Sequence, residues 1–173
     1  MKSLFLSIFL VITTACNDNG GGSSSSGPSN SPNSYLPQDI ASNPDLKCAV
    51  VIDSSFDISS VNGTQDFIIN NVEVNSKIVS SSCESNEVEN ISNLFKVERA
   101  ENEIIFVDDE SSDPEIYTIQ NNTFHDESAA GYSYDVNGQE FTCDMRMFLD
   151  GNITESSLST RLKIAFIGDC DQE

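Results

Sequence analysis

GYSYDVNGQEFTCDMRMFLDGNITESSLSTRLKIAFIGDC, residues 131–170, is the stretch that decides the fold. Asn137-Gly138, between YSYDV and QEFTC, is the dipeptide that most strongly predicts a two-residue β-hairpin turn. The turn fixes the register of both flanking strands, since each residue then has one partner. The pairs expected on one face are Val136–Gln139, Tyr134–Phe141 and Tyr132–Cys143.

A second hairpin follows if the next turn centres on Ser156-Ser157, because apolar residues then meet apolar residues and acids meet bases. This register sets Cys143 opposite Cys170. The other pairs it predicts are Met147–Phe166, Leu149–Ile164, Gly151–Leu162, Asp150–Lys163, Asn152–Arg161, Phe148–Ala165 and Arg146–Ile167. The face that carries Phe148 and Ala165 is not purely polar, so we expect a strand layer, a partner or an apolar ligand to cover part of it.

Short runs rich in Val, Ile, Phe and Tyr recur upstream, separated by Asn, Asp, Ser and Gly, and no helical period is sustained. Strands at this spacing without intervening helices predict an all-β fold. We expect an antiparallel up-and-down barrel or a β-sandwich of about eight to ten strands. Further hairpins would pair Val97–Phe106, Arg99–Ile104 and Val72–Val79.

The chain has five cysteines, of which Cys16 stands alone in a low-complexity region. The other four lie in patterned sequence and allow three disulfide connectivities. Because the predicted hairpin brings Cys143 to Cys170, we expect Cys48 to pair with Cys83, so that two disulfides brace the domain.

The first residues, MKSLFLSIFLVITTAC, have the order of a signal peptide: Lys2, an apolar run that is too short to span a bilayer, then small residues. With Cys16 after Thr14-Ala15, the segment resembles the lipobox of bacterial lipoproteins, although Thr13 stands where that family usually has leucine. The resemblance implies cleavage before Cys16 and lipidation of its sulfur. It also implies anchoring in the outer membrane of the cell envelope, since asparagine rather than aspartate follows the cysteine.

The predicted organisation is therefore a signal peptide (1–15), a lipidated Cys16 with a disordered Gly/Ser/Asn/Pro tether (16–45), and one β-domain (46–173). The tether is too polar to offset the entropy of ordering it. As a flexible chain of about 30 residues it would span on the order of 30 Å.

The charge balance excludes whole classes of partner. Eight Lys and Arg stand against 28 Asp and Glu, and removing Lys2 with the signal takes the net charge from −20 to −21. Nucleic acid and anionic lipid headgroups would repel such a chain. We expect an acidic monomer that contacts the membrane only through its lipid anchor and has an unidentified protein or small-molecule partner.

Few residues offer catalytic or metal chemistry. His125 is the only histidine, and no G-x-S-x-G motif occurs. His125 could carry a proton or supply half of a metal site, but a lone histidine in an acidic segment is usually exposed. The acidic run DDESSDPE contains the candidate calcium ligands Asp108, Asp109, Glu110 and Asp113, although its spacing fails as an EF-hand. A solvated loop is the preferred interpretation, and no other cofactor is expected.

Two functions remain open at this point. The first is a lipid-anchored, non-enzymatic envelope protein whose β-domain binds a ligand or partner or plays a structural role. The second is an anchored hydrolase that acts on envelope polymers through paired carboxylates. A cleft with two close, buried acids would favour the hydrolase, whereas a filled interior would favour the binding protein.

Overall fold

The computed structural model describes residues 31–83, 95–108, 114–136 and 139–170. The described elements are η1 (Pro32–Tyr35), α2 (Gln38–Ala41), β1 (Leu46–Asp57), β2 (Phe67–Val72), β3 (Val74–Ser81), β4 (Phe95–Ala100), β5 (Glu103–Asp108), β6 (Glu115–Thr118), β7 (Thr123–Val136), β8 (Gln139–Ile153) and β9 (Ser157–Gly168). The expected all-β fold is confirmed.

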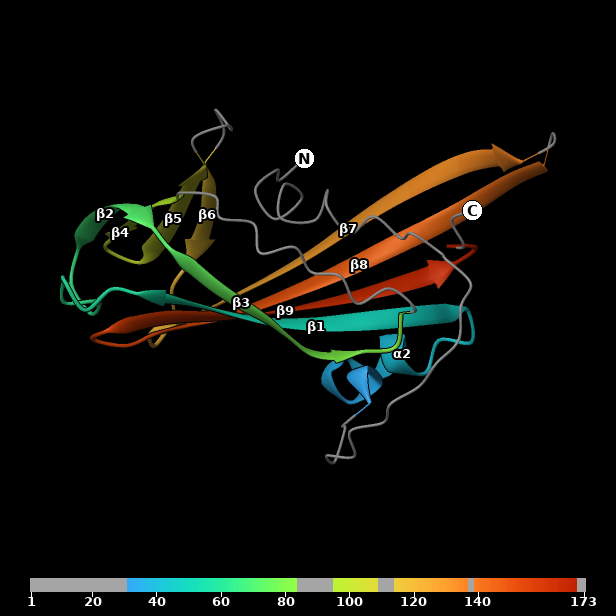
Figure 1. Cartoon of the computed structure of the whole chain (residues 1–173), viewed down its shortest axis with the longest axis horizontal. Coiled ribbons are helices and arrows are strands. Elements are labelled where there is room, and N and C mark those ends of the chain that lie inside the picture. The colour runs from blue at the N-terminus through green and yellow to red at the C-terminus, as the bar shows by residue number, and fades with distance from the viewer. Residues whose placement is uncertain (1–30, 84–94, 109–113, 137–138, 171–173) are drawn as a thin grey trace, which may run out of the picture.

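The strands form two antiparallel sheets, a five-stranded sheet of order β3-β1-β9-β8-β7 and a four-stranded sheet of order β2-β4-β5-β6. Figure 1 shows the long strands of the five-stranded sheet side by side, with the smaller sheet near one end. The two sheets pack as a sandwich, and no barrel closure appears among the described strands.

The core lies between the sheets and contains a cluster of aromatic rings. Phe106 is at its centre, with ring centroids of Phe56, Tyr117 and Phe124 at 5.9, 5.9 and 6.3 Å. Tyr117 and Phe124 stack at 5.3 Å. These contacts fill the space between the sheets with apolar side chains.

The first predicted hairpin is confirmed, because Val136 pairs with Gln139 and the register continues through Tyr132–Cys143 to Thr123–Asn152. The upstream pairs Val97–Phe106 and Arg99–Ile104 are also confirmed.

The register predicted for the second hairpin is wrong by two residues. In the structure Cys143 lies opposite Gly168 rather than Cys170, and Asp150 lies opposite Arg161 rather than Lys163. The corrected partners of the remaining predicted positions are Met147–Ile164, Leu149–Leu162, Gly151–Thr160, Asn152–Ser159, Phe148–Lys163 and Arg146–Ala165. A shift of two residues keeps every side chain on its predicted face, so the hydrophobic pattern could not reveal it.

The predicted pairing of Val72 with Val79 is also wrong. β2 pairs with β4 in the small sheet, while β3 leaves for the large sheet and pairs with β1. Asn71, near the end of β2, has a φ of 58° in the left-handed region, where asparagine is tolerated, and only Glu73 separates the two strands. The short link therefore carries the chain from one layer to the other instead of forming a hairpin.

Residues 32–41, here called the cap, differ most from the sequence analysis, which placed them in a disordered tether. Leu36 and Ile40 are buried against Ala49, Phe148 and Ala165 on the outer face of the large sheet, the face that points away from the small sheet. Figure 1 shows α2 beside β1. The apolar patch expected around Phe148 and Ala165 is thus covered by the chain's own N-terminal segment.

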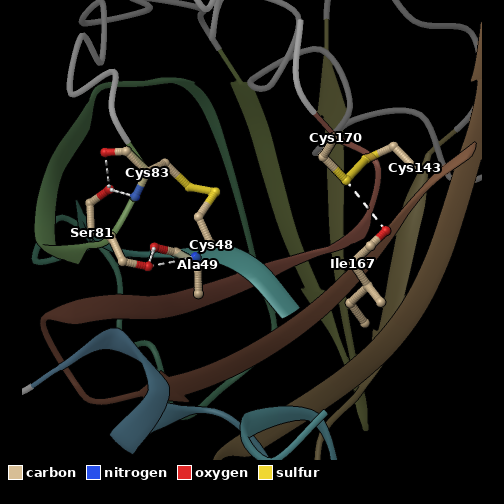
Figure 2. The surroundings of a disulfide bond; sticks show 8 residues. Cys48, Ala49, Ser81, Cys83, Cys143, Ile167 and Cys170 are labelled. Carbon is tan, nitrogen blue, oxygen red and sulfur yellow. Dashed lines mark hydrogen bonds between the residues drawn. A yellow bond between two sulfur atoms is a disulfide. The ribbon is translucent and has the colours of Figure 1, made fainter. Parts of the chain in front are cut away.

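Both expected disulfides are present, Cys48–Cys83 and Cys143–Cys170, with Cα separations of 5.0 and 4.7 Å. Figure 2 shows them together in one region of the molecule. Cys170 reaches Cys143 despite the corrected register because the chain turns at Gly168, whose φ of 88° suits glycine. Beyond this turn the amide of Asp169 donates to the carbonyl of Thr142 (3.1 Å).

Candidate functional site

A row of ionisable residues crosses the outer face of the large sheet, one from each strand. The row follows from the strand registers and consists of Lys77, Asp53, Arg161, Asp150 and His125 on β3, β1, β9, β8 and β7. Basic and acidic residues alternate along it. In a chain with so few bases, this alternation gives the row a near-neutral surface that can both donate and accept hydrogen bonds.

Asp53 and Arg161 form the best-defined pair in this row. Nε and Nη2 of Arg161 donate to the two carboxylate oxygens of Asp53 at 2.7 and 2.8 Å. The Tyr35 ring of the cap lies 5.2 Å from the guanidinium, a cation–π contact. The hydrogen bond to Asp53 raises the pKa of Arg161, and the fork geometry holds both side chains in place.

Asp150 is held from two sides. Lys163 Nζ lies 2.5 Å from Oδ2, and His125 Nδ1 lies 2.8 Å from Oδ1. Burial alone would raise the pKa of Asp150, but the hydrogen bonds and charges of Lys163 and His125 outweigh it and hold the pKa below its usual range. Asp150 is therefore an ionised acceptor.

A second row of small polar residues runs parallel to the first, two positions along each strand. It consists of Asn75, Ser55, Ser159, Asn152 and Thr123, and it carries hydroxyl and amide groups only. The two rows line a hollow of ≈ 1040 Å³, which we call the polar groove. Thr118, at the end of β6, and Gln120, in the link to β7, complete the lining. The size of the groove is at the upper end of small-molecule sites, and most of the residues that line it carry polar side chains.

The floor of the polar groove is fixed by the packing beneath it. Phe124 is buried on the core side of the sheet, and its ring packs against Gly151. A Cβ added at position 151 would come within 2.0 to 2.4 Å of three ring carbons. Glycine is therefore required at this position. The ring in turn packs against Tyr117 and Phe106, so the floor continues into the aromatic core.

A separate acid lies inside the sandwich. Glu115 is only 3% exposed, and the Tyr117 hydroxyl donates to its Oε2 at 2.5 Å. Burial first, then the hydrogen bond and charge of Glu115, raise the pKa of Tyr117 above its usual range. This pair lies in the core and does not line the polar groove.

Of the candidate site residues named from the sequence, some lie in described strands and others lie outside the described residues. His125 lies in a strand, is exposed and joins the groove. Asp108 ends β5, whereas Cys16, Asp109, Glu110 and Asp113 lie outside the described residues. Within the described ranges, no group of three or more His, Cys, Asp or Glu could hold a metal ion, so calcium binding stays a prediction. The same ranges contain no helix long and apolar enough to cross a membrane.

The groove itself was not predicted from sequence. The only available signal was the alternation SLSTRLKIAF against LDGNIT, which places polar residues on one face of two adjacent strands. Its remaining members come from β1, β3 and β7, far away in the chain. No protein-family model, curated protein or solved structure matches this chain, so the geometry of the polar groove is the basis for a functional proposal.

Proposed function

We propose that this chain is a lipid-anchored envelope protein whose non-enzymatic β-domain binds the oligosaccharide part of an envelope or external polymer in the polar groove. The observation that carries the proposal is the pair of polar rows that cross all five strands. Four interstrand spacings of about 4.8 Å make the rows roughly 19 Å long, which suits an extended ligand.

The chemistry of the lining favours a polyhydroxylated ligand. Amide and hydroxyl side chains such as Asn152, Ser159 and Thr123 can each donate and accept hydrogen bonds, as sugar hydroxyls do. Asp150 supplies carboxylate acceptors and Arg161 supplies guanidinium donors. The core beneath is filled by aromatic rings, which argues against an interior site for an apolar ligand.

The proposed location rests on the N-terminal sequence. The lipobox-like segment before Cys16 and the polar residues after it would attach the domain to the outer membrane by acyl chains. Because the cap packs on the large sheet, the proposed tether would be about half as long as residues 16–45, with a span on the order of 20 Å. The groove would then lie close to the membrane surface.

The carboxylates of the groove do not favour the alternative, an anchored hydrolase. A general acid in glycoside hydrolysis needs a raised pKa, whereas the pKa of Asp150 is lowered by Lys163 and His125. Asp53, the other acid of the ionisable row, is bound on both oxygens by Arg161. Both acids are therefore suited to binding and orientation.

The test is a calorimetric titration of the mature chain with soluble oligosaccharides from peptidoglycan, lipopolysaccharide and neutral glucans. We expect one of these classes to bind, and the double variant Asn152→Ala/Ser159→Ala to weaken that binding about tenfold or more, since two groove hydrogen-bonding groups are lost. Asn70→Ala is the matched control, because Asn70 is an exposed strand residue of the small sheet. Equal binding by both variants, or no binding by any class, contradicts the proposal.

A further inference from the structure

We propose that β7 is a self-association edge, through which two copies of this chain form a two-fold dimer by antiparallel β7–β7 pairing. The starting observation is that, among the described strands, β7 pairs with β8 along its whole length and no strand is hydrogen-bonded to its other edge, apart from the isolated bridge between Gln120 and Thr123 at its start. An edge strand presents a row of backbone donors and acceptors that can pair with another strand.

The other three sheet edges are blunted by features known to prevent edge pairing. β6 has four residues and follows Pro114. β2 has a register shift after Ile69 and a left-handed residue at Asn71. β3 faces a register shift between Val51 and Ile52 and carries Lys77. Each of these edges is short, bent or charged.

β7 carries charged residues towards both ends, but it is neither short nor bent. Its 14 residues, TFHDESAAGYSYDV, pair with β8 without a register shift, and they contain no proline and no lysine. The centre, Ser128 to Gly131, has only small side chains, so a second backbone can approach closely. Asp126, whose position faces the core side, is the one inward acid near the start of the strand.

A second copy of this chain is the occupant that the sequence of β7 favours. In the register where Ala130 crosses its own copy, Ala129 lies opposite Gly131, Glu127 opposite Ser133 and His125 opposite Asp135. β7 carries three acidic residues, and in this register none of them lies opposite another acid. His125, the one basic residue of the strand, lies opposite an acid. Cross-strand pairs of this kind stabilise an antiparallel ladder.

The large net negative charge opposes association, so the dimer should strengthen as salt screens the repulsion between copies. A two-fold axis perpendicular to the sheet keeps both outer faces on the same side. The dimer would then present two polar grooves on one face, a consequence that rests on the proposed function and would increase avidity for a polymer. This inference replaces the monomer expected from composition.

The test is sedimentation equilibrium of the mature chain at low and high salt, with the variant Ala129→Glu. In the dimer the two introduced carboxylates would lie diagonally across the two-fold axis and repel each other. Within one copy, the cross-strand partner of position 129 is Arg146, a favourable partner for glutamate, so the variant should fold. We expect a monomer–dimer equilibrium that tightens with salt and that A129E weakens about tenfold or more. The control V79E, on the opposite edge of the same sheet, should leave the equilibrium unchanged.

Cross-linking tests the register independently of affinity. In the proposed dimer A130C should form an intermolecular disulfide under mild oxidation, and V79C should not. A chain that stays monomeric at all salt concentrations, a dimer that A129E does not weaken, or a monomer that co-purifies with a foreign peptide along β7 would each overturn the proposal. Ligand binding by the groove does not enter these readouts, so their failure would leave the proposed function untouched.

Discussion

Gly151→Ala should destabilise the fold strongly, although it adds a single methyl group. The new Cβ would lie 2.0 to 2.4 Å from three carbons of the Phe124 ring, far inside van der Waals contact. The ring cannot move away easily, since it stacks on Tyr117 at 5.3 Å and lies beside Phe106. Overpacking of a core costs about 1–3 kcal/mol, and the rigid surroundings place this case near 2–3 kcal/mol. For a domain of this size, Tm should fall by roughly 6–9 °C.

The assay is thermal unfolding followed by circular dichroism, with Gly131→Ala as the matched control on the neighbouring strand. There the added Cβ would come within 2.9 Å of Oδ1 of Asp144, the far end of a flexible side chain, and would lie in ordinary contact with the Cys143 carbonyl oxygen at 3.5 Å. Stability should therefore stay within about 0.5 kcal/mol of the parent. A smaller side chain in Phe124→Leu should recover much of the loss in the double variant with Gly151→Ala. Equal Tm values for the two glycine variants would refute the close packing described for the groove floor.

Four other predictions follow from single features. Replacing Cys143 and Cys170 by serine should cost about 3.5 kcal/mol in the chain-entropy model for a separation of 27 residues, measured by urea unfolding; no change would contradict it. Burial and Glu115 raise the pKa of Tyr117, so the stability that the neutral phenol contributes is complete below the unfolded pKa of about 10 and is lost as the pH rises through the folded pKa. Tyr117→Phe should therefore reduce the fall of the unfolding free energy with pH above about 10, and an unchanged slope would refute the buried position of this phenol. Ile40→Ala should expose the cap to limited proteolysis, whereas equal protease resistance would argue against its docking. Intact-mass analysis should find residues 1–15 absent and acyl mass on Cys16, and an unmodified chain would exclude the anchor.

The sequence identified face but not register in the second hairpin. Asn137-Gly138 predicts one turn type, so the pairing from Val136–Gln139 onward was correct. No such dipeptide marks the turn before β9, and charge matching supported a register two residues away. Asp150 does contact Lys163, as predicted, but diagonally, since its direct partner is Arg161. The matching of apolar and charged residues across the strands is therefore compatible with two registers, which differ by two residues, one full side-chain period.

The cap and the polar groove escaped prediction for a different reason. Leu36 and Ile40 are isolated apolar residues in a polar segment, and their burial depends on small residues such as Ala49 and Ala165, which leave room on the sheet. The polar rows likewise depend on strand order, which places β1 between β3 and β9. Long-range order of this kind is not encoded in local periodicity, whereas the all-β class is. The disulfide pairing was correct although the register behind it was two residues off, because the turn at Gly168 brings Cys170 back to Cys143.

The central claim, that the polar groove binds an oligosaccharide, is tested most directly by amide chemical-shift mapping of the mature chain during titration with the class of oligosaccharide that binds. The account predicts shifts that concentrate on the residues of the two polar rows, with Asn152, Ser159 and Arg161 among the largest, and little change in β2, β4 and β5. Shifts concentrated on the small sheet, or spread evenly over the domain without saturation, would contradict it.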